Sequence, residues 1–259
     1  MPRPRHPDPD FATTLAHGLA LLQCFRVGET TLSNKALAER TGLSKATVSR
    51  LTYTLAARGL LQYDVDLRHY RLGSTALSLA YPLLAGMKIR QIARSRMARL
   101  ADRVGGPVSL GMRDRLQMVY VETSRGHESS AFRPDIGGSL PMLATAMGRA
   151  WLCQVPAALR ATVLEALREA DAEQWRSQQA GWAQAGQTFA AHGYCVCEAA
   201  WLSDGYAVAV PMRREVDGEI LAFNCGVPRA RLTPGKLERE IAPLLLHMVR
   251  EIEAELERL

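Results

Sequence analysis

The stretch SNKALAERTGLSKATVSRLTYTLAAR, residues 33–58, decides the fold of the N-terminal part of this 259-residue chain. Ser33 and Ser44 each precede a run of helix-forming residues and are expected to cap a helix through their hydroxyl groups. Gly42 stands between the two runs, at a tight turn where a positive φ would be costly for other residues. Apolar residues lie where they can lock the second helix against the first: Leu37, Ala38, Leu43, Val48, Leu51 and Leu55. The stretch therefore predicts two helices joined by a sharp turn.

The flanking segments complete a known architecture. An amphipathic helix is predicted over about residues 11–26, with apolar residues at helical spacing: Leu15, Leu19, Leu22 and Phe25. After Gly59 the pattern changes to short strands at 60–63 and 68–72, which predict a hairpin. A packing helix, a helix-turn-helix and a hairpin together predict a winged helix-turn-helix, whose second helix can enter the major groove of DNA.

The exposed half of the second helix supplies the chemistry that base contacts need. It offers hydroxyls, a cation and short side chains, and the candidate DNA contacts there are Ser44, Lys45, Thr47, Ser49, Arg50 and Tyr53. Ser33 and Asn34 are candidate phosphate contacts, Arg68 is a candidate contact from the hairpin, and Arg3 and Arg5 can follow as a flexible arm. Arg50 can bind guanine bidentately or touch only phosphate, and both alternatives remain open.

Positive charge is concentrated in the first two fifths of the chain. The formal net charge is +6, with +4 over residues 1–86, +5 over residues 87–103 and −3 over the remainder. The asymmetry favours a nucleic-acid partner for the first segment. The arginines of 87–103 lie outside the predicted DNA-binding part, so we expect them to be solvated or to lie at an interface.

Composition excludes several classes of protein. Hydrophobic residues make up 47% and charged residues 22%, as in ordinary globular proteins, and no apolar run is long enough for a membrane span. The Pro-rich residues 1–10 predict a disordered arm without the apolar core of a secretory signal. We therefore expect a cytoplasmic protein whose five cysteines are reduced.

The domain organisation follows from these patterns. We expect an arm at 1–10, a DNA-binding domain at 11–73, a linker helix at 74–88, interrupted near Pro82 and Gly86, and a second domain at 89–259. The second domain mixes predicted helices (89–104, 142–151, 156–169, 174–192 and 233–257) with predicted strands (108–113, 117–123, near 130–133, 194–198, 205–212 and 219–227). A turn at Val216-Asp217-Gly218 joins the last two strands. The predicted fold class is α+β, with helices packed on one side of a sheet.

Several motifs resemble the isocitrate lyase regulator (IclR) family of bacterial transcription factors. The resemblance covers about residues 11–256 and is carried by LAHGLALL at 15–22, LAERTGLSKATVSRL at 37–51, YRLG at 70–73, LPMLATAMGRA at 140–150, HGY at 192–194 and AVAVP at 207–211. It implies a winged helix-turn-helix joined by a helical linker to a GAF-like α/β effector-binding domain. It also implies a repressor or activator that forms homodimers, commonly homotetramers, and binds a palindromic operator under the control of a small effector.

The resemblance also places an effector site. The corresponding positions are Ala146, Met147, Cys197, Ala207, Asn224 and Gly226. Backbone N–H groups near Ala146 and Met147 would suit a carboxylate, since a helix N-terminus favours anions. The family often has an acidic residue at the position of Cys197 and serines at those of Asn224 and Gly226; Leu143 replaces its usual histidine and Arg149 its usual lysine. With Trp201 and Tyr206 near the expected mouth, these departures favour an organic carboxylate that is larger or aromatic.

Other functions have weaker support in the sequence. Cys195 and Cys197 share a strand face and raise the question of a metal or redox role, but Cys153 and Cys225 would have to converge with them to form a zinc site. We expect buried thiols, no metal and no cofactor. The sequence contains no GxSxG, HExxH, Walker or GxGxxG motif, so an enzyme is not expected. The remaining alternative is a C-terminal domain that serves only oligomerisation.

Overall fold

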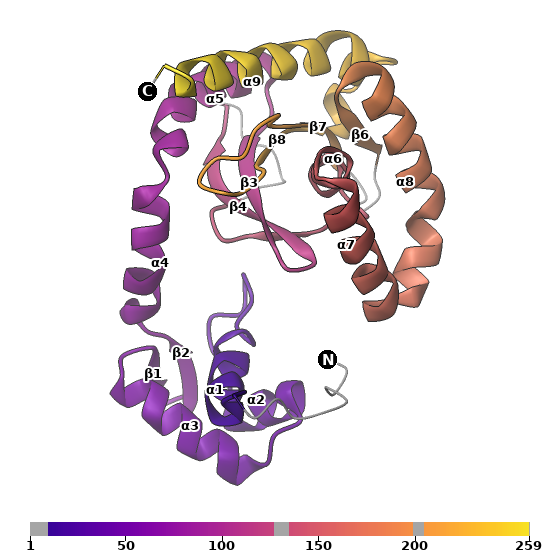
Figure 1. The fold of residues 1–259 in the computed structure, drawn as a ribbon. Helices are drawn as coiled ribbons and strands as arrows, with labels where there is room; N and C mark the ends of the chain where they lie inside the picture. The colour runs from indigo at the N-terminus through magenta and orange to yellow at the C-terminus, as the bar shows by residue number, and fades with distance from the viewer. Residues whose placement is uncertain (1–9, 127–134, 199–204, 259) are drawn as a thin grey trace. The chain divides into compact units, whose positions relative to one another are not determined.

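The structure is a computed structural model that describes residues 10–126, 135–198 and 205–258. The chain forms two compact units, Met1–Gly86 and Met87–Leu259, and each is described by itself (Figure 1). Among the described residues, no helix combines the length and apolar character that crossing a bilayer requires.

The first unit is a winged helix-turn-helix, as predicted. Its elements are α1 (Thr13–Leu22), α2 (Asn34–Thr41), α3 (Lys45–Ala57), β1 (Leu61–Asp64), β2 (His69–Leu72) and α4 (Ser74–Gly86). The Oγ of Ser33 accepts a hydrogen bond from Ala36 N, and Gly42 ends α2 with φ +69°. β1 and β2 pair antiparallel. The capping serine and the glycine therefore begin and end the helix as the sequence predicts.

The core of this unit differs from the predicted helix face. Leu21, Leu37 and Val48 form its buried centre, with Leu43, Leu51 and Leu55 packed around them. On α1, however, Leu15 is 63% exposed and Leu19 is 51% exposed. The predicted stripe therefore faces the core only in part: the inner face runs through Gly18 and Leu21, and Phe25 of the stripe packs against the core, whereas Leu15 and Leu19 do not. α1 therefore presents leucines to the outside of its own unit.

Helix α4 is unusual because it is apolar but unburied. It continues through Pro82 and ends at Gly86, so the predicted interruption at Pro82 is wrong. None of its residues, all of which the structure describes, is buried. Its exposed apolar side chains are Leu77, Leu79, Tyr81 and Leu83.

The second unit is built on a six-stranded antiparallel sheet. The strands are β3 (Val108–Asp114), β4 (Gln117–Ser124), β5 (Ser139–Pro141), β6 (Cys195–Glu198), β7 (Gly205–Pro211) and β8 (Ala222–Pro228), in the order β5-β4-β3-β8-β7-β6. β7 and β8 are joined through the predicted turn, where Asp217 and Gly218 both have positive φ. These angles are those of the tight hairpin turns that match strand twist.

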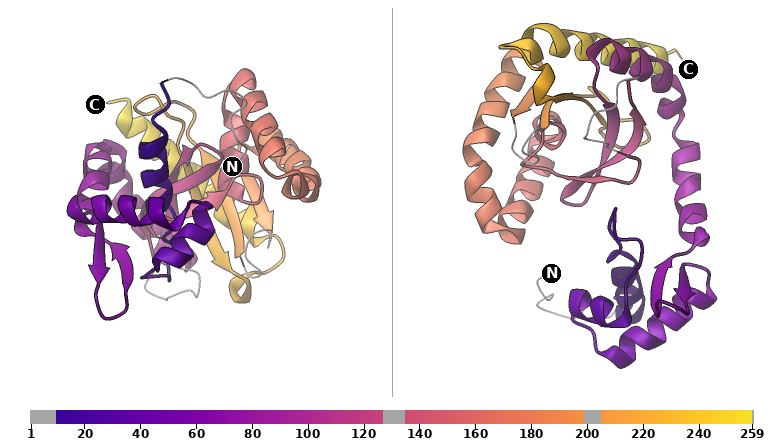
Figure 2. Two further views of the ribbon diagram at one scale, coloured as in Figure 1. Left: turned by 90° about the horizontal axis from the view of Figure 1, so that it is seen from below. Right: turned by 180° about the vertical axis from the view of Figure 1, so that it is seen from behind.

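Helices cover both faces of the sheet, which corrects the prediction of helices on one side. α5 (Lys88–Val104) and α9 (Ala242–Leu256) pack together on β3, β4, β7 and β8 (Figure 2). α6 (Ala146–Gln154) packs on the other face, flanked by α7 (Ala157–Ala170) and α8 (Ala172–His192). Both sheet faces are therefore buried, which explains why the strands read as apolar runs rather than alternating ones.

Some boundaries differ from those predicted. β5 was not predicted, and the helix expected from Met142 begins only at Ala146 because Thr145 caps it, its Oγ1 accepting from Gly148 N. The last helix is preceded by a 3-10 turn (Arg229–Arg231) and a π-helical turn (Leu237–Ile241). The strand expected near 130–133 lies outside the described residues.

Candidate functional site

The N-terminal half of α3 displays the predicted DNA contacts. Ser44 caps the helix, its Oγ accepting from Thr47 N at 3.2 Å. Lys45, Ser49 and Arg50 are exposed, as is the ring of Tyr53. Their cations, hydroxyls and aromatic edge form a surface that can meet phosphates and base edges.

The helical register refines this surface. Ala46, Ser49, Arg50 and Tyr53 are spaced at three, one and three residues and are all exposed, so they form one face. Thr47 is half-buried, and its hydroxyl lies 2.9 Å from that of Ser44, so this hydroxyl is already engaged within the helix start. Ala46 was missed because its methyl carries no polar signal, although a methyl at this position can contact a thymine methyl.

The remaining predicted DNA contacts lie at the N-terminus of α2 and on the wing. Ser33 caps α2, and Asn34 Oδ1 accepts from Thr52 Oγ1 at 3.4 Å, which ties α2 to α3 while leaving the Asn34 amide nitrogen as a donor. Arg68 is exposed at the hairpin turn with φ +53°, next to Leu67, whose N–H is held by Asp64 Oδ1. Arg3 and Arg5 lie outside the described residues.

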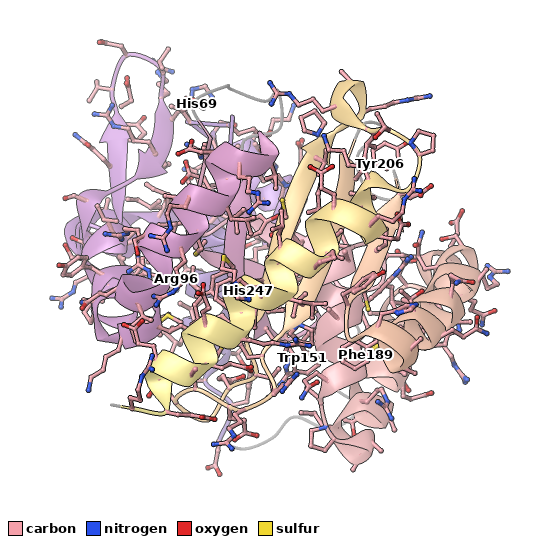
Figure 3. All side chains as sticks on the ribbon, turned by 90° about the horizontal axis from the view of Figure 1, so that it is seen from above. His69, Arg96, Trp151, Phe189, Tyr206 and His247 are labelled. Carbon is pink, nitrogen blue, oxygen red and sulfur yellow. The ribbon has the colours of Figure 1, made fainter. Side chains whose placement is uncertain are left out.

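The basic helix α5 uses its arginines inside its own unit. Arg90 and Arg94 both contact Oε2 of the buried Glu122, at 3.0 and 2.9 Å. Arg96 pairs with Glu255 of α9 at 2.6 Å, and Figure 3 shows it beside the α9 residue His247. Three of the six basic residues of α5 are therefore paired with carboxylates of β4 and α9.

A row of polar residues crosses the sheet face that α6 covers. Ser109 of β3 is paired with Thr123 of β4 on one side and with Asn224 of β8 on the other, and Asn224 is paired with Ala209. Thr123 Oγ1 donates to Ser109 Oγ at 3.1 Å. Paired residues point to the same face, so these side chains gather on one side of the sheet.

A β-bulge brings Tyr120 to the same face. The register shifts between Leu110 and Gly111, so Leu110 pairs with Glu122 whereas Gly111 pairs with Tyr120. Such bulges re-aim side chains and are frequent near functional sites. Tyr120 and Thr123 thus share the inner face although they are three residues apart.

Asn224 presents a buried hydrogen-bond acceptor in this polar row. Its side chain hydrogen-bonds to the Tyr120 hydroxyl, and burial raises the pKa of Tyr120 to about 12 in spite of this bond. Asn224 is only 7% exposed, and its Oδ1 has no hydrogen-bond partner among the described residues. A buried acceptor without a donor costs about 1–3 kcal/mol, so the site is suited to a ligand that supplies a donor.

The other predicted effector residues border this polar row. Cys197, Ala207 and Gly226 are paired in one line across β6, β7 and β8, two residues along from Asn224. Ala146 and Met147 begin α6, and Met147 Sδ packs so closely on Gly111 that a side chain at that glycine would collide with it. The Thr145 cap takes the N–H of Gly148, which leaves those of Ala146 and Met147 as first-turn donors.

Sequence reasoning missed Ser109, Tyr120 and Thr123 as members of this site. Polar residues within an apolar strand gave a signal, but the bulge that aligns them cannot be inferred from composition. Tyr206 was expected near the mouth of the site; strand alternation puts it on the face opposite Ala207, so that expectation is wrong. Trp201 lies outside the described residues.

The thiols do not converge as a zinc site would require. Cys195 and Cys197 share the inner face, whereas Cys225 alternates with Asn224 and lies on the other, where burial raises its pKa to about 12. Within residues 10–126, 135–198 and 205–258, no three His, Cys, Asp or Glu side chains are grouped to hold a metal ion. Arg149, at the family's lysine position, is buried and donates to Leu143 O at 2.7 Å and to Gln178 Oε1 at 2.9 Å.

Comparison with known proteins gives one consistent answer. The IclR helix-turn-helix domain matches residues 14–65, and the C-terminal domain of the bacterial transcriptional regulator IclR matches residues 82–254. The HTH-type transcriptional regulator TsaQ1/TsaQ2 of Comamonas testosteroni is 35% identical over 94% of this chain and 88% of its own length.

Solved structures agree with the sequence comparison. An IclR family transcriptional regulator from Brucella abortus is 40% identical, with a TM-score of 0.85 over 96% of this chain and 94% of that one. An IclR homologue from Microbacterium hydrocarbonoxydans, solved with 4-hydroxybenzoate, is 22% identical with a TM-score of 0.71 over 95% of this chain and 100% of that one, and it shows the shared fold. With a winged helix-turn-helix, a two-faced sheet unit and these matches over both, the chain belongs to the IclR family of DNA-binding transcriptional regulators.

Proposed function

We propose that this regulator binds a palindromic operator through α3 and the wing, and that an aromatic carboxylate carrying a hydroxyl controls its affinity for DNA. The effector would bind on the sheet face beside Asn224. Ligand binding that favours one arrangement of the two DNA-binding units over another changes operator affinity by that difference in free energy. A DNA-binding regulator acts where the chromosome is, which in a bacterium is the cytoplasm.

The single observation that supports the effector class is the unpartnered Oδ1 of the buried Asn224. The Asn224 Oδ1 acceptor repels a carboxylate but can accept a hydrogen bond from a hydroxyl group. Ser109 and Thr123 beside it can continue the hydrogen-bond chain. The N–H groups of Ala146 and Met147 at the start of α6 suit the carboxylate at the other end of the ligand. The Microbacterium homologue solved with 4-hydroxybenzoate is consistent with this chemistry.

Calorimetric titration with matched ligands tests the effector. We expect 4-hydroxybenzoate to bind more tightly than benzoate, and pyruvate to bind weakly. In Asn224→Leu the preference for the hydroxylated ligand should disappear, because its hydroxyl loses its acceptor. Equal binding of the two aromatic acids by the unaltered protein would contradict the assignment of Asn224, and tight binding of pyruvate alone would contradict the aromatic class.

The predicted homodimer, and the tetramer that the family resemblance implies, have a candidate contact surface in the first unit. α1 exposes Leu15 and Leu19, and α4 exposes leucines over its whole length. Exposed apolar faces of this kind mark interaction sites. Sedimentation of Leu79→Glu/Leu83→Glu should show loss of the dimer, with Lys35→Glu, an exposed polar position on α2, as the matched control. An unchanged sedimentation coefficient would place the contact elsewhere.

The competing proposal is that the second unit serves only oligomerisation and binds no effector. It predicts that no organic acid raises the melting temperature of the protein or alters operator binding. Selection of bound fragments from genomic DNA would supply the operator, and genes beside it would indicate the metabolite to be tested.

A further inference from the structure

Two thiols that the proposed function does not use lie against each other in the second unit. Cys153 is in the last turn of α6, and Cys195 is the first residue of β6. Cys153 packs against the buried cluster to which Cys195 belongs, and the two side chains interact through a hydrogen bond, while the Cys195 Sγ also lies 3.8 Å from its acceptor Ala185 O. Cys153 is half-buried, whereas Cys195 is fully buried in the cluster between α6 and the sheet.

The other cysteines do not offer an equivalent pair. Cys195 and Cys197 are two apart on one strand, so their Cα atoms are about 6.6 Å apart, close to the upper limit for a disulfide. The Cys197 Sγ instead donates to Ala144 O at 3.3 Å. Cys225 lies on the opposite face of the sheet, and Cys24 lies in the first unit. Cys153 and Cys195 are thus the two thiols that the fold brings together.

The two thiols differ in a way that assigns their roles. The hydrogen bond with Cys195 lowers the pKa of the Cys153 thiol; partial burial opposes this shift, and the positive charge of Arg160 supports it. Arg160 is held in place because its Nη1 donates to Cys153 O at 3.3 Å. The same hydrogen bond and burial raise the pKa of Cys195. Since the thiolate is the nucleophile, the half-buried Cys153 is the one to react first.

We propose that Cys153 and Cys195 are a peroxide-reactive dithiol that closes into a disulfide between α6 and β6. The Cys153 thiolate attacks one oxygen of a hydroperoxide, the O–O bond breaks, and Cys153 becomes a sulfenic acid while hydroxide or alkoxide leaves and takes up a proton. The Cys195 sulfur then attacks the Cys153 sulfur, the S–O bond breaks, and the hydroxide leaves as water with the Cys195 proton. Two thiols are oxidised by two electrons, and the peroxide is reduced to water, or to an alcohol and water.

The site of this disulfide gives it a consequence for the regulator. Cys195 is paired with Ala209, which is paired with Asn224, so the crosslink would end two strands from the proposed effector contact. A covalent link between α6 and β6 would restrict the movement of the helix whose N-terminus faces that site. The chemistry can be tested without any effector, so its failure is separable from failure of the proposed function.

Thiol counting on the full-length protein tests the proposal. The reduced protein is treated with a small excess of hydrogen peroxide, and free thiols are counted after denaturation and mapped by mass spectrometry of alkylated peptides. We expect two of the five thiols to be lost and a Cys153–Cys195 crosslink to be recovered, reversibly with dithiothreitol. Cys197→Ala, the matched control, should form the same crosslink.

Two further variants separate the steps. Cys153→Ser should lose no thiol pair, and Cys195→Ala should accumulate a sulfenic acid at Cys153 that dimedone labels; circular dichroism checks that each variant is folded. If Cys195→Ala does not fold, the crosslink map of the unaltered protein and Cys153→Ser still decide the matter. An unreactive Cys153, a crosslink to another cysteine, or thiol loss that persists in Cys153→Ser would overturn the proposal.

Discussion

Replacing Glu122 with glutamine should destabilise the second unit strongly. The Glu122 side chain is only 6% exposed, and its Oε2 holds Arg90, itself 12% exposed, and Arg94, which is 61% exposed. Glu122→Gln keeps the shape but leaves the Arg90 charge buried beside a neutral amide. Breaking a buried pair by removing one partner costs about 3–5 kcal/mol, and we expect the lower end because the amide oxygen still accepts a hydrogen bond. For a unit of this size, about 3 kcal/mol corresponds to a fall of about 6–12 °C in melting temperature.

Two further variants test whether the loss of stability comes from the buried Glu122–Arg90 pair. Arg94→Met removes the exposed partner and should cost less than about 1 kcal/mol, since solvent screens that pair. Glu122→Leu/Arg90→Met removes the buried charges together and should recover much of the loss, because well-packed apolar residues can replace a buried pair. A double-mutant cycle over Glu122 and Arg90 isolates their coupling.

The assay can report on the second unit alone. The four tryptophans, Trp151, Trp175, Trp182 and Trp201, all belong to it, so their fluorescence during urea unfolding follows this unit. A loss below 1 kcal/mol in Glu122→Gln, or an equal loss in Arg94→Met, would refute the argument. The ion pairs on Glu122 would then contribute little to the stability of the second unit.

Four other substitutions test the structure. Arg50→Ala should weaken operator binding by about 1–3 kcal/mol and relax the sequence preference at one base pair. Lys45→Ala should weaken binding to all DNA sequences alike and lower the slope of log affinity against log salt concentration by about one. Fluorescence anisotropy measures both, and equal effects of Arg50→Ala on specific and random DNA would mean that Arg50 contacts only phosphate. Ser44→Ala removes the α3 cap and should lower the unfolding free energy of the first unit by about 1 kcal/mol in urea titrations followed by circular dichroism, and no loss would mean that the cap is dispensable. Burial raises the pKa of Cys225 from its ordinary 9.0 to about 12 on folding. The stability that its neutral thiol provides is therefore complete below pH 9 and is lost as the pH rises toward 12, by about 1.4 kcal/mol per pH unit. Cys225→Ala should flatten that part of the profile of unfolding free energy against pH, and an unchanged profile would contradict the assignment.

The DNA-binding part could be predicted because its signals are local. Ser33, Gly42 and Ser44 each determine a cap or a turn by their own chemistry, and the structure confirms all three. The apolar stripe predicted over residues 11–26 faces the core only in part, for a physical reason. Periodicity identifies an apolar stripe but not what covers it, and the exposed Leu15 and Leu19 are free to be covered by something outside their own unit.

The inner face of the sheet could be predicted only in part. The family resemblance supplied Asn224 and its line of neighbours, but Ser109, Tyr120 and Thr123 depend on strand register. A one-residue shift turns every later side chain to the other face, and the shift here is a bulge between Leu110 and Gly111. Gly111 is the one local signal in this stretch, since a glycine inside a strand often marks a bulge, but it does not say which strand carries the extra residue.

The bulge also links the two sets of residues that matter in the second unit. Because the register shifts there, Tyr120 turns toward Asn224 on the inner face while Glu122, two residues on, turns toward Arg90 of α5 on the outer face. Tyr120 and Glu122 are thus two residues apart on one strand but bind partners on opposite faces of the sheet. If the bulge couples the two faces, Tyr120→Phe should change the coupling between Glu122 and Arg90, and a double-mutant cycle over that pair, repeated in Tyr120→Phe, measures the change. An unchanged coupling would mean that the two faces of β4 act independently.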